Sequence, residues 1–433
     1  MTFQELYRAK RRLPAEIAAM VEDGWSCCTD IAAAVPPALM DALGDRAAQG
    51  GMRDVQLHTM LDLREHGALT AAAHNGLTPV SWFSGARLRT AINEGRADVM
   101  PCYYRDMPQL FRDYTPVDTM FTMVSPMDEQ GYFSTGIVGS VSPQLFQKAK
   151  HIFLEVNRYV PRALNGPKIH ISQVTALCEH DAPLPTLPPT EIDPISCTIG
   201  GLIAEEVPNG ATIQLGIGGV PEAVGMALKV KHDLGIHTEL FTDSMVELIQ
   251  SGAVTNTRKP IHTGKTVATM AFGSQRMYDF IDNNPDFVFL PVDYVNDPAV
   301  ISQHPNFVSV NAAVEVDIFG QVCAESIGTH HISGSGGQVD YVRGATQSAG
   351  GKSFIAFPST AMNGSVSRIV STLTPGAIVT TSKNDVDYIA TEYGVAKLRG
   401  KTLSQRAKAL IAIAHPDFRD KLTYQAKRRN ILI

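Results

Sequence analysis

The stretch Ala211–Gly252, ATIQLGIGGVPEAVGMALKVKHDLGIHTELFTDSMVELIQSG, decides the fold class. It predicts a strand over 211–215, a glycine turn, a helix that begins near Pro221, a second strand over 236–241 and a second helix. Strands that alternate with helices at this spacing are typical of an open α/β sheet with parallel strands. Because the carboxyl ends of such strands share one rim, we expect the glycine turn and Glu239 to lie at the same rim.

Both features of this rim have chemical uses. The glycines of the Gly216–Gly219 turn let backbone N–H groups approach an anion, and the following helix adds its dipole. Glu239 could act as a base or as a covalent nucleophile. Taken alone, a glycine turn is as often a plain tight turn, and a lone glutamate is more often a solvated surface charge. Their combination inside one strand–helix–strand unit favours a functional site.

Composition and charge limit the class of protein. The chain has 433 residues, 44% of them apolar, a formal net charge of −6 and a pI of about 6.1. That length predicts two domains or more, and the lack of a basic excess argues against a general nucleic-acid binder. The sequence has no apolar run of membrane-spanning length, and its N-terminal segment lacks the apolar core of a signal peptide. We therefore expect a cytoplasmic protein without a membrane partner.

The six cysteines and the pair His330-His331 do not indicate a metal site. The cysteines show no CxxC spacing. Adjacent histidines on a strand point to opposite faces, so they would not share one metal ion. We expect neither a bound metal nor a permanently bound cofactor.

The chain divides at a proline-rich segment and then repeats itself. DAPLPTLPP, at residues 181–189, is a stiff extended linker by composition, so we predict an N-terminal domain over 1–185 and a C-terminal domain over 190–433. Three motifs recur in the same order about 190 residues apart, which predicts a duplicated α/β domain. The pairs are Phe83–Arg87 with Phe272–Arg276, Asp106–Pro108 with Asn296–Pro298, and Asp128–Ser134 with Asp317–Cys323.

The glycine turn occurs in one copy only. Its counterpart in the first half is roughly Thr29–Ala32, which contains no glycine. The counterpart of Glu239 falls near Asp54. We therefore predict a single active site, with its nucleophile in the second half and the first half as a partner wall.

Two downstream stretches could add to this site. Gly334–Gly337 is a second glycine turn that suits an anionic or carbonyl ligand, although a plain flexible loop has the same composition. PGAIVTTSKN, at Pro375–Asn384, predicts a strand with polar residues at its carboxyl end. Either a ligand site or an ordinary turn would fit that end.

Several long motifs resemble the acetyl-CoA hydrolase/transferase family over nearly the whole chain. They are LGIGGVPEAV (215–224), GIHTELFTDSMVELI (235–249), NAAVEVD (311–317), GQVCAESIG (320–328), SGSGGQVDYVRGA (333–345) and TEYGVAKLRGKTLSQRA (391–407). Within that family the motifs are most similar to those of the 4-hydroxybutyrate CoA-transferases. The resemblance implies two open α/β domains of the NagB/RpiA/CoA-transferase-like type, which agrees with the duplication.

The resemblance also implies roles for single residues. The family's nucleophile is a glutamate in a G-I-H-[ST]-E segment, which corresponds to Glu239. More distant CoA-transferases carry theirs in an E-N-G motif, so Glu325, in ESIG, is the rival nucleophile. The implied CoA-binding and oxyanion-stabilising residues of the first glycine turn are Gly216, Ile217, Gly218, Gly219 and Val220. Further implied CoA contacts are Asn311, Val314, Gly336, Gly337 and Asn384 with its neighbour Lys383.

The implied activity is CoA transfer between a short-chain acyl-CoA and a carboxylate acceptor, with acetate and either 4-hydroxybutyrate or butyrate as the acids. It would pass through an acyl-glutamyl anhydride and a covalent glutamyl-CoA thioester, with CoA as a substrate. If water reached the anhydride, the enzyme would be an acyl-CoA hydrolase instead. A non-catalytic CoA-binding protein is a third possibility. The resemblance also implies a homodimer in short-chain fatty acid metabolism, and we expect acyl-pocket residues around Thr59, Phe83 and 120–127.

Overall fold

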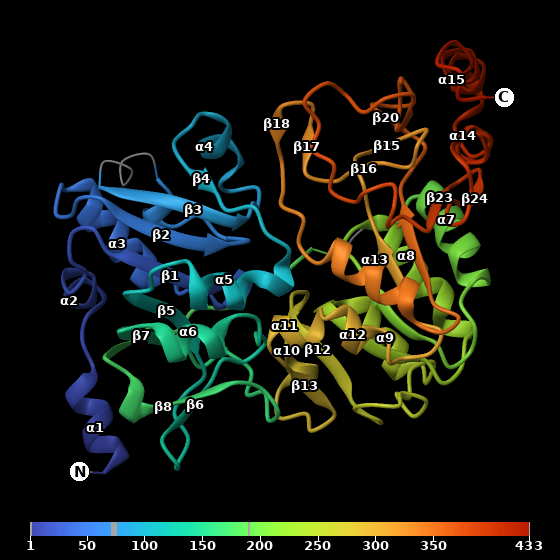
Figure 1. Ribbon diagram of the computed structural model, residues 1–433. Coiled ribbons are helices and arrows are strands. Elements are labelled where there is room, and N and C mark those ends of the chain that lie inside the picture. Colours follow the sequence, from blue (N-terminus) through green and yellow to red (C-terminus); the bar gives the residue numbers. More distant parts are fainter. Residues whose placement is uncertain (1, 71–75, 189–190, 433) are drawn as a thin grey trace. The chain divides into compact units, whose positions relative to one another are not determined.

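The computed structural model describes residues 2–70, 76–188 and 191–432 (Figure 1). The chain forms two compact units that separate inside the predicted linker. Two later segments fold with the first unit, so a single cut does not divide the chain. The first unit is Met1–Leu187, Val267–Val295 and Ile332–Gly334, and the second is Pro188–Thr266, Asn296–His331 and Ser335–Ile433.

A seven-stranded parallel sheet, in the order β4-β3-β2-β1-β5-β7-β9, is the centre of the first unit. Strands β1 and β5 are buried along their whole length, as central strands of parallel sheets usually are. The strand order reverses between them, which creates a switch point at their carboxyl ends. The strands are β1 (Ser26–Ile31), β2 (Val55–Met60), β3 (Leu77–Phe83), β4 (Asp98–Val99), β5 (Thr119–Val124), β7 (His151–Val156) and β9 (Ala176–Glu179).

Helices α2 and α3 pack on this sheet, where Ile17 and Leu43 meet Phe121 and Phe153 in a buried core. Proline at the first turn begins α2, α3, α5 and α6, where its missing N–H costs nothing. The helices are α1 (Phe3–Lys10), α2 (Pro14–Ala19), α3 (Pro37–Ala48), α4 (Arg89–Asn93), α5 (Met107–Asp113) and α6 (Ser142–Lys148). From later in the chain, α10 (Gln275–Ile281), β13 (Phe287–Phe289) and α11 (Val292–Val295) belong to this unit.

The second unit repeats this arrangement. Its parallel strands run β11-β10-β14-β19-β23, and β24 adds an antiparallel edge. The order β11-β10-β14-β19 corresponds to β2-β1-β5-β7 of the first unit, so the predicted class of two duplicated open α/β domains is confirmed. The strands are β10 (Thr212–Leu215), β11 (Gly235–Phe241), β14 (Val308–Asn311), β19 (Lys352–Ala356), β23 (Tyr388–Thr391) and β24 (Gly394–Lys397).

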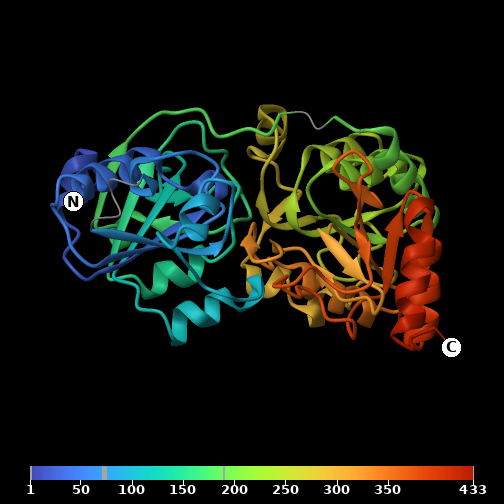
Figure 2. The same cartoon turned by 90° about the horizontal axis from the view of Figure 1, so that it is seen from above.

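Seven helices and several short hairpins complete the described part of the second unit. Helix α14 contacts β24, and the C-terminal helices α14 and α15, red in Figure 2, cover a second buried core. Within the described residues, no helix is long and apolar enough to cross a membrane. The helices are α7 (Pro194–Glu205), α8 (Gly219–Ala227), α9 (Asp243–Gln250), α12 (Pro298–Ile301), α13 (Gln338–Gln347), α14 (Leu403–Ala412) and α15 (Pro416–Arg428). The hairpin β20 (Thr360–Ala361) and β21 (Val366–Ser367) lies after β19.

The predicted strand within Pro375–Asn384 is wrong. The N–H of Ile378 donates to the hydroxyl of Ser326 at 2.9 Å, and just before the segment the N–H of Thr374 donates to the carboxylate of Glu315 at 2.7 Å. These backbone N–H groups therefore donate to side-chain oxygens, whereas in a strand they would donate to a neighbouring strand. Pro375 has no N–H group to donate. The segment is an irregular loop with one bridge, between Val322 and Thr381.

Candidate active site

Glu239 lies near the carboxyl end of β11, and it is the residue of that strand that keeps some exposure to solvent. The other six residues of β11 are buried. Strand β11 pairs in parallel with β10, with Thr212 opposite Gly235 and Ile213 opposite Ile236. Continued by three residues, this register brings Gly216 level with Glu239. The glycine turn and the glutamate therefore lie at one rim of the sheet, as the sequence predicts.

Two donors hold the Glu239 carboxylate. The Asn296 Nδ2 atom donates to Glu239 Oε2 at 2.7 Å, and the backbone N–H of Gly337 also donates to the carboxylate. Asn296 is fully buried, and its Oδ1 atom has no hydrogen-bond partner among the described residues. Its amide group therefore points its donor at the glutamate and holds it in one orientation.

Gly337 is at this place because nothing larger fits. A Cβ atom at this position would lie 2.0 Å from Glu239 Oε2 and 2.2 Å from Asn296 Nδ2. Gly337 is also the residue that precedes α13, so its N–H belongs to the positive end of that helix. The Gln338 side chain fixes this end, because it donates to the carbonyl of Ala312 at 2.7 Å and accepts from Thr381 at 2.9 Å.

Burial raises the pKa of Glu239 to about 7, against the opposite effect of the hydrogen bonds from Asn296 and Gly337. At neutral pH the group is thus divided between carboxylic acid and carboxylate. The ionised form is more basic, and so more nucleophilic, than an ordinary surface glutamate. The residue as a whole is partly exposed to solvent, unlike its neighbours in β11.

The first glycine turn leads into the N-terminus of α8. Gly216 donates its N–H to the Val310 carbonyl at 2.9 Å. Gly218 has φ 118° and precedes α8 without a side-chain cap, so the first N–H groups of that helix are left for another acceptor. Ile217 is exposed, Val220 is buried in α8, and a Cβ on Gly219 would lie 3.1 Å from Ser196 Oγ.

The other predicted CoA contacts are distributed over the same unit. Asn311 ends β14 and exchanges two amide hydrogen bonds with Gln214, at 3.2 and 3.3 Å. Val314 donates to Cys323 at 2.8 Å, and its carbonyl accepts from Arg368. Gly336 has φ 52° next to Gly337. Asn384 is exposed on a turn at the end of the irregular loop.

Glu325, the rival nucleophile, has a different environment. Burial raises its pKa, and its hydrogen-bond partner is the hydroxyl of Thr380. The amide pair that holds Glu239 thus distinguishes the two glutamates. Asn296 was not predicted as a site residue, although its motif had already been matched to Asp106–Pro108 in the duplication.

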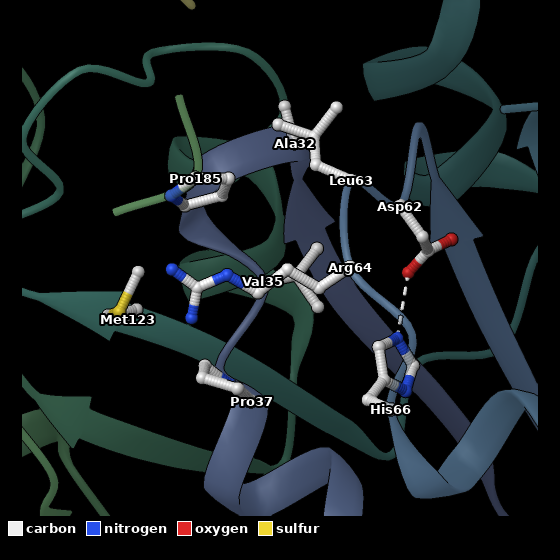
Figure 3. A pocket seen from close by; sticks show the side chains of 9 residues that line it. All are labelled: Ala32, Val35, Pro37, Asp62, Leu63, Arg64, His66, Met123 and Pro185. Atoms are coloured by element: carbon white, nitrogen blue, oxygen red, sulfur yellow. Dashed lines mark hydrogen bonds and ion pairs between the residues drawn. The ribbon is translucent and has the colours of Figure 1, made fainter. Parts of the chain in front are cut away.

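The first unit has a small pocket at the carboxyl ends of β1, β2 and β5 (Figure 3). Its walls include Arg64, Met123 and the pair Asp62 and His66, whose Oδ1 and Nε2 atoms are 3.0 Å apart. Next to it, the end of β1 carries Asp30, which accepts hydrogen bonds from Ser142 at 2.7 Å and Thr122 at 3.0 Å. In the first unit, the side chains of Asp30, Ser142 and Thr122 therefore occupy the sheet rim that corresponds to the position of the glycine turn in the second unit.

No metal centre is present in the part of the chain that the structure describes. No group of three or more histidine, cysteine, aspartate or glutamate side chains there is placed to hold a metal ion.

The chain matches two domain models of one known family, which together cover most of its length. The acetyl-CoA hydrolase/transferase N-terminal domain matches residues 1–188, and the C-terminal domain of the same family matches residues 273–426. The chain is 48% identical to the succinyl-CoA:cyclohexane-1-carboxylate CoA transferase of Geobacter metallireducens, over 99% of this chain and 98% of the relative. It is 47% identical to the 4-hydroxybutyrate coenzyme A transferase of Clostridium kluyveri, over 82% of each chain.

A solved structure agrees with these matches. RipA from Yersinia pestis superposes with a TM-score of 0.95 at 38% identity, over 100% of both chains. Acetyl-CoA hydrolases are more distant relatives, with 23% identity to that of Neurospora crassa over 90% of this chain and 82% of the relative. The chain therefore belongs to the acetyl-CoA hydrolase/transferase family.

Proposed function

We propose that the protein is a CoA-transferase in which Glu239 carries CoA covalently between two acids. The observation that supports this most directly is the Glu239 carboxylate itself, which accepts hydrogen bonds from Asn296 and the Gly337 N–H and has its pKa raised to about 7 by burial. A structural ion pair would be expected to lower the pKa of a glutamate. A reactive carboxylate gains from the opposite shift.

The reaction follows from carboxylate chemistry. The Glu239 carboxylate attacks the thioester carbonyl of an acyl-CoA, and CoA leaves as the thiolate with formation of an acyl-glutamyl anhydride. The thiolate then attacks the glutamyl carbonyl, which gives a glutamyl-CoA thioester and a free acid. A second carboxylate runs these two steps in reverse and leaves with CoA. Each bond that breaks is matched by one that forms, so no external oxidant, reductant or strong base is needed.

The two donors serve the intermediates as well as the free carboxylate. Each attack on a carbonyl passes through a tetrahedral oxyanion, which amide N–H groups stabilise when they are already in place. Asn296 and Gly337 are positioned by buried structure, so they need little reorganisation during the reaction. The first N–H groups of α8, after Gly218, lie at the same rim and could serve the thioester or the CoA chain.

We propose short-chain acids as substrates, with acetate and either 4-hydroxybutyrate or butyrate as the pair. The support is the relative from C. kluyveri, whose name states 4-hydroxybutyrate. The relative from G. metallireducens, whose name states cyclohexane-1-carboxylate, makes a wider acid range the first alternative to test. We also propose a homodimer, which rests on the family resemblance, and a cytoplasmic location, which rests on the lack of membrane-spanning apolar runs in the sequence.

The test is to trap the covalent intermediate. The enzyme is incubated with acetyl-CoA, treated with borohydride and digested, and its peptides are analysed by mass spectrometry. We expect the reduced glutamyl adduct on the peptide that carries Glu239, and none in a Glu239→Gln variant. An adduct on Glu325 would keep the function and move the nucleophile. Steady release of acetate without adduct would favour the acyl-CoA hydrolase. A matched Glu325→Gln variant should keep the adduct if Glu239 is the nucleophile and lose it if Glu325 is.

A further inference from the structure

The backbone N–H of Gly337 belongs to a peptide bond between two glycines, Gly336 and Gly337. Glycine has more conformational freedom than any other residue, so local steric contacts do not orient this donor. The missing side chain is nevertheless required, because a Cβ atom on Gly337 would lie 2.0 Å from Glu239 Oε2. The direction of the N–H must therefore be fixed by the residues that follow.

Gln338 is the first residue after these glycines that has a side chain, and it begins helix α13. Glutamine is mostly an exposed residue, but here only 9% of Gln338 is exposed to solvent. Burying an amide group costs free energy unless its donor and its acceptor are both satisfied. Both are satisfied here, by partners from two other segments of the second unit.

These two partners orient the Gln338 amide group. Its Nε2 atom donates to the Ala312 carbonyl at 2.7 Å, directly after the end of β14. Since a carbonyl can only accept, this bond identifies the nitrogen of the amide and places Oε1 towards Thr381. The Thr381 hydroxyl donates to Oε1 at 2.9 Å. The planar amide is therefore held at both of its polar atoms.

Thr381 is itself fixed by its surroundings. It is fully buried in the irregular loop described above. Its N–H and its carbonyl both bond to Val322, at 3.2 and 3.0 Å, in the bridge to β16 (Val322–Cys323). Two residues later, Arg406 of α14 donates to the Lys383 carbonyl at 2.6 Å. The loop is thus attached to the second unit at Thr381 and again just beyond it.

We propose that Gln338 and Thr381 are positioning residues for the proposed reaction. Together they direct the N–H of Gly337 at the Glu239 carboxylate. The proposal rests on the CoA-transferase function proposed above and adds the side chains that hold one of its two donors in place. Both side chains act through the backbone of Gly337 and not through contact with the reacting atoms.

The direction of this N–H matters for two reasons. The hydrogen bond from Gly337 lowers the pKa of Glu239 against the effect of burial, so it favours the carboxylate form that attacks. In the proposed reaction the same N–H stabilises the oxyanion that forms at the glutamyl carbonyl. A displacement of about 1 Å in such a group can cost about 100-fold in rate.

The first test removes the Thr381 hydroxyl and keeps the shape of the side chain. In Thr381→Val we expect kcat to fall about tenfold with KM for acetyl-CoA unchanged. The acid limb of the pH–rate profile should move to higher pH, because a weaker hydrogen bond from Gly337 lowers the pKa of Glu239 less. Thr381→Ser keeps the hydroxyl and should behave as the wild type. A Thr381→Val enzyme with the wild-type kcat and profile would overturn the proposal.

A second variant and a matched control complete this test. Gln338→Met removes both hydrogen bonds of the amide at similar side-chain length, so it should shift the profile at least as far. The control is Thr380→Val in the same loop, since the Thr380 hydroxyl bonds to Ala324, at 2.9 Å, and to Glu325. It should leave the pKa of Glu239 unchanged. Equal shifts in both threonine variants would indicate a general loosening of the loop and would refute the positioning role.

A direct titration separates this proposal from the proposed function. The ¹³Cδ signal of Glu239, identified by its loss in Glu239→Gln, should titrate with a pKa of about 7 in the wild type and with a higher pKa in Thr381→Val. The titration needs no turnover, so a protein that shows this shift but transfers no CoA keeps the positioning role and loses the proposed function. Equal pKa values in the two proteins would refute the positioning role, whatever the activity.

Discussion

At the scale of single residues, the ionisation of Glu239 sets the working pH. Burial raises its pKa to about 7, so protonation removes the nucleophile as the pH falls through 7. We expect kcat/KM for acetyl-CoA to fall about tenfold per pH unit on the acid side of that value. The measurement is a pH–rate profile from pH 5 to 9. A flat profile down to pH 5 would contradict the assignment.

Asn296 should affect both this profile and the rate. Its hydrogen bond lowers the pKa of Glu239, so Asn296→Ala should move the acid limb of the profile to higher pH. Loss of one donor to the oxyanion should also reduce kcat by about 100-fold at the pH optimum. Asn93→Ala is the control, since Asn93 is exposed and donates to the Arg89 carbonyl of its own helix. A lower rate without a shift of the pH–rate profile would show that Asn296 has only a structural role.

At the scale of elements, adjacent glycines of α7 should respond in opposite directions. A Cβ on Gly201 would meet no atom within 4 Å, so Gly201→Ala should stabilise the protein by about 1 kcal/mol through its better helix propensity. A Cβ on Gly200 would lie 2.7 Å from the backbone of Ala223 in α8, so Gly200→Ala should destabilise. Urea denaturation of the two variants measures both signs. Equal effects would show that the α7–α8 contact is not tight.

The β10–α8–β11 segment was readable from the sequence because glycine and proline mark its boundaries. The predicted strands over 211–215 and 236–241 differ from Thr212–Leu215 and Gly235–Phe241 by one residue each. The irregular loop after Thr374 was not readable. Its apolar residues have the composition of a strand, but Glu315 and Ser326, which lie elsewhere in the chain, take the amides. The strand propensity of a segment contains no information on hydrogen-bond acceptors that lie so far away in the sequence.

At the scale of the whole molecule, buried histidine should make the protein sensitive to acid. His304 is fully buried beside His237 and Phe307, and burial lowers its pKa to about 3. In the unfolded chain the His304 ring is protonated as the pH falls through 6.5, whereas in the folded protein it stays neutral down to about pH 3. The free energy of unfolding therefore decreases between pH 6.5 and 3.

Replacing His304 tests that sign. The free energy of unfolding of His304→Phe, minus that of the wild type, should grow by about 1.4 kcal/mol for each pH unit below 6.5. Guanidinium denaturation at several pH values measures the difference, which cancels the carboxyl groups common to both proteins. Lys259 and His262 face the same ring and should titrate alike in both. A constant difference would mean that His304 is protonated in the folded state.

The whole site was less readable than the fold. The duplication and the motif around Glu239 gave the class and the candidate nucleophile, since both are local patterns in the sequence. Asn296 is separated from Glu239 by 57 residues, and only the folding of β11 and the segment before α12 brings them together. Their pairing, and the raised pKa that depends on burial, required the structure.

The missing side chain of Gly337 also limits how the gene can change. Every single-base change that replaces a glycine codon with that of another amino acid adds a Cβ atom, and here any Cβ would overlap both Glu239 and Asn296. No stepwise route through alanine or serine is open, so this position cannot drift neutrally. A lineage that lost this glycine would have to rebuild the nucleophile's surroundings at the same time.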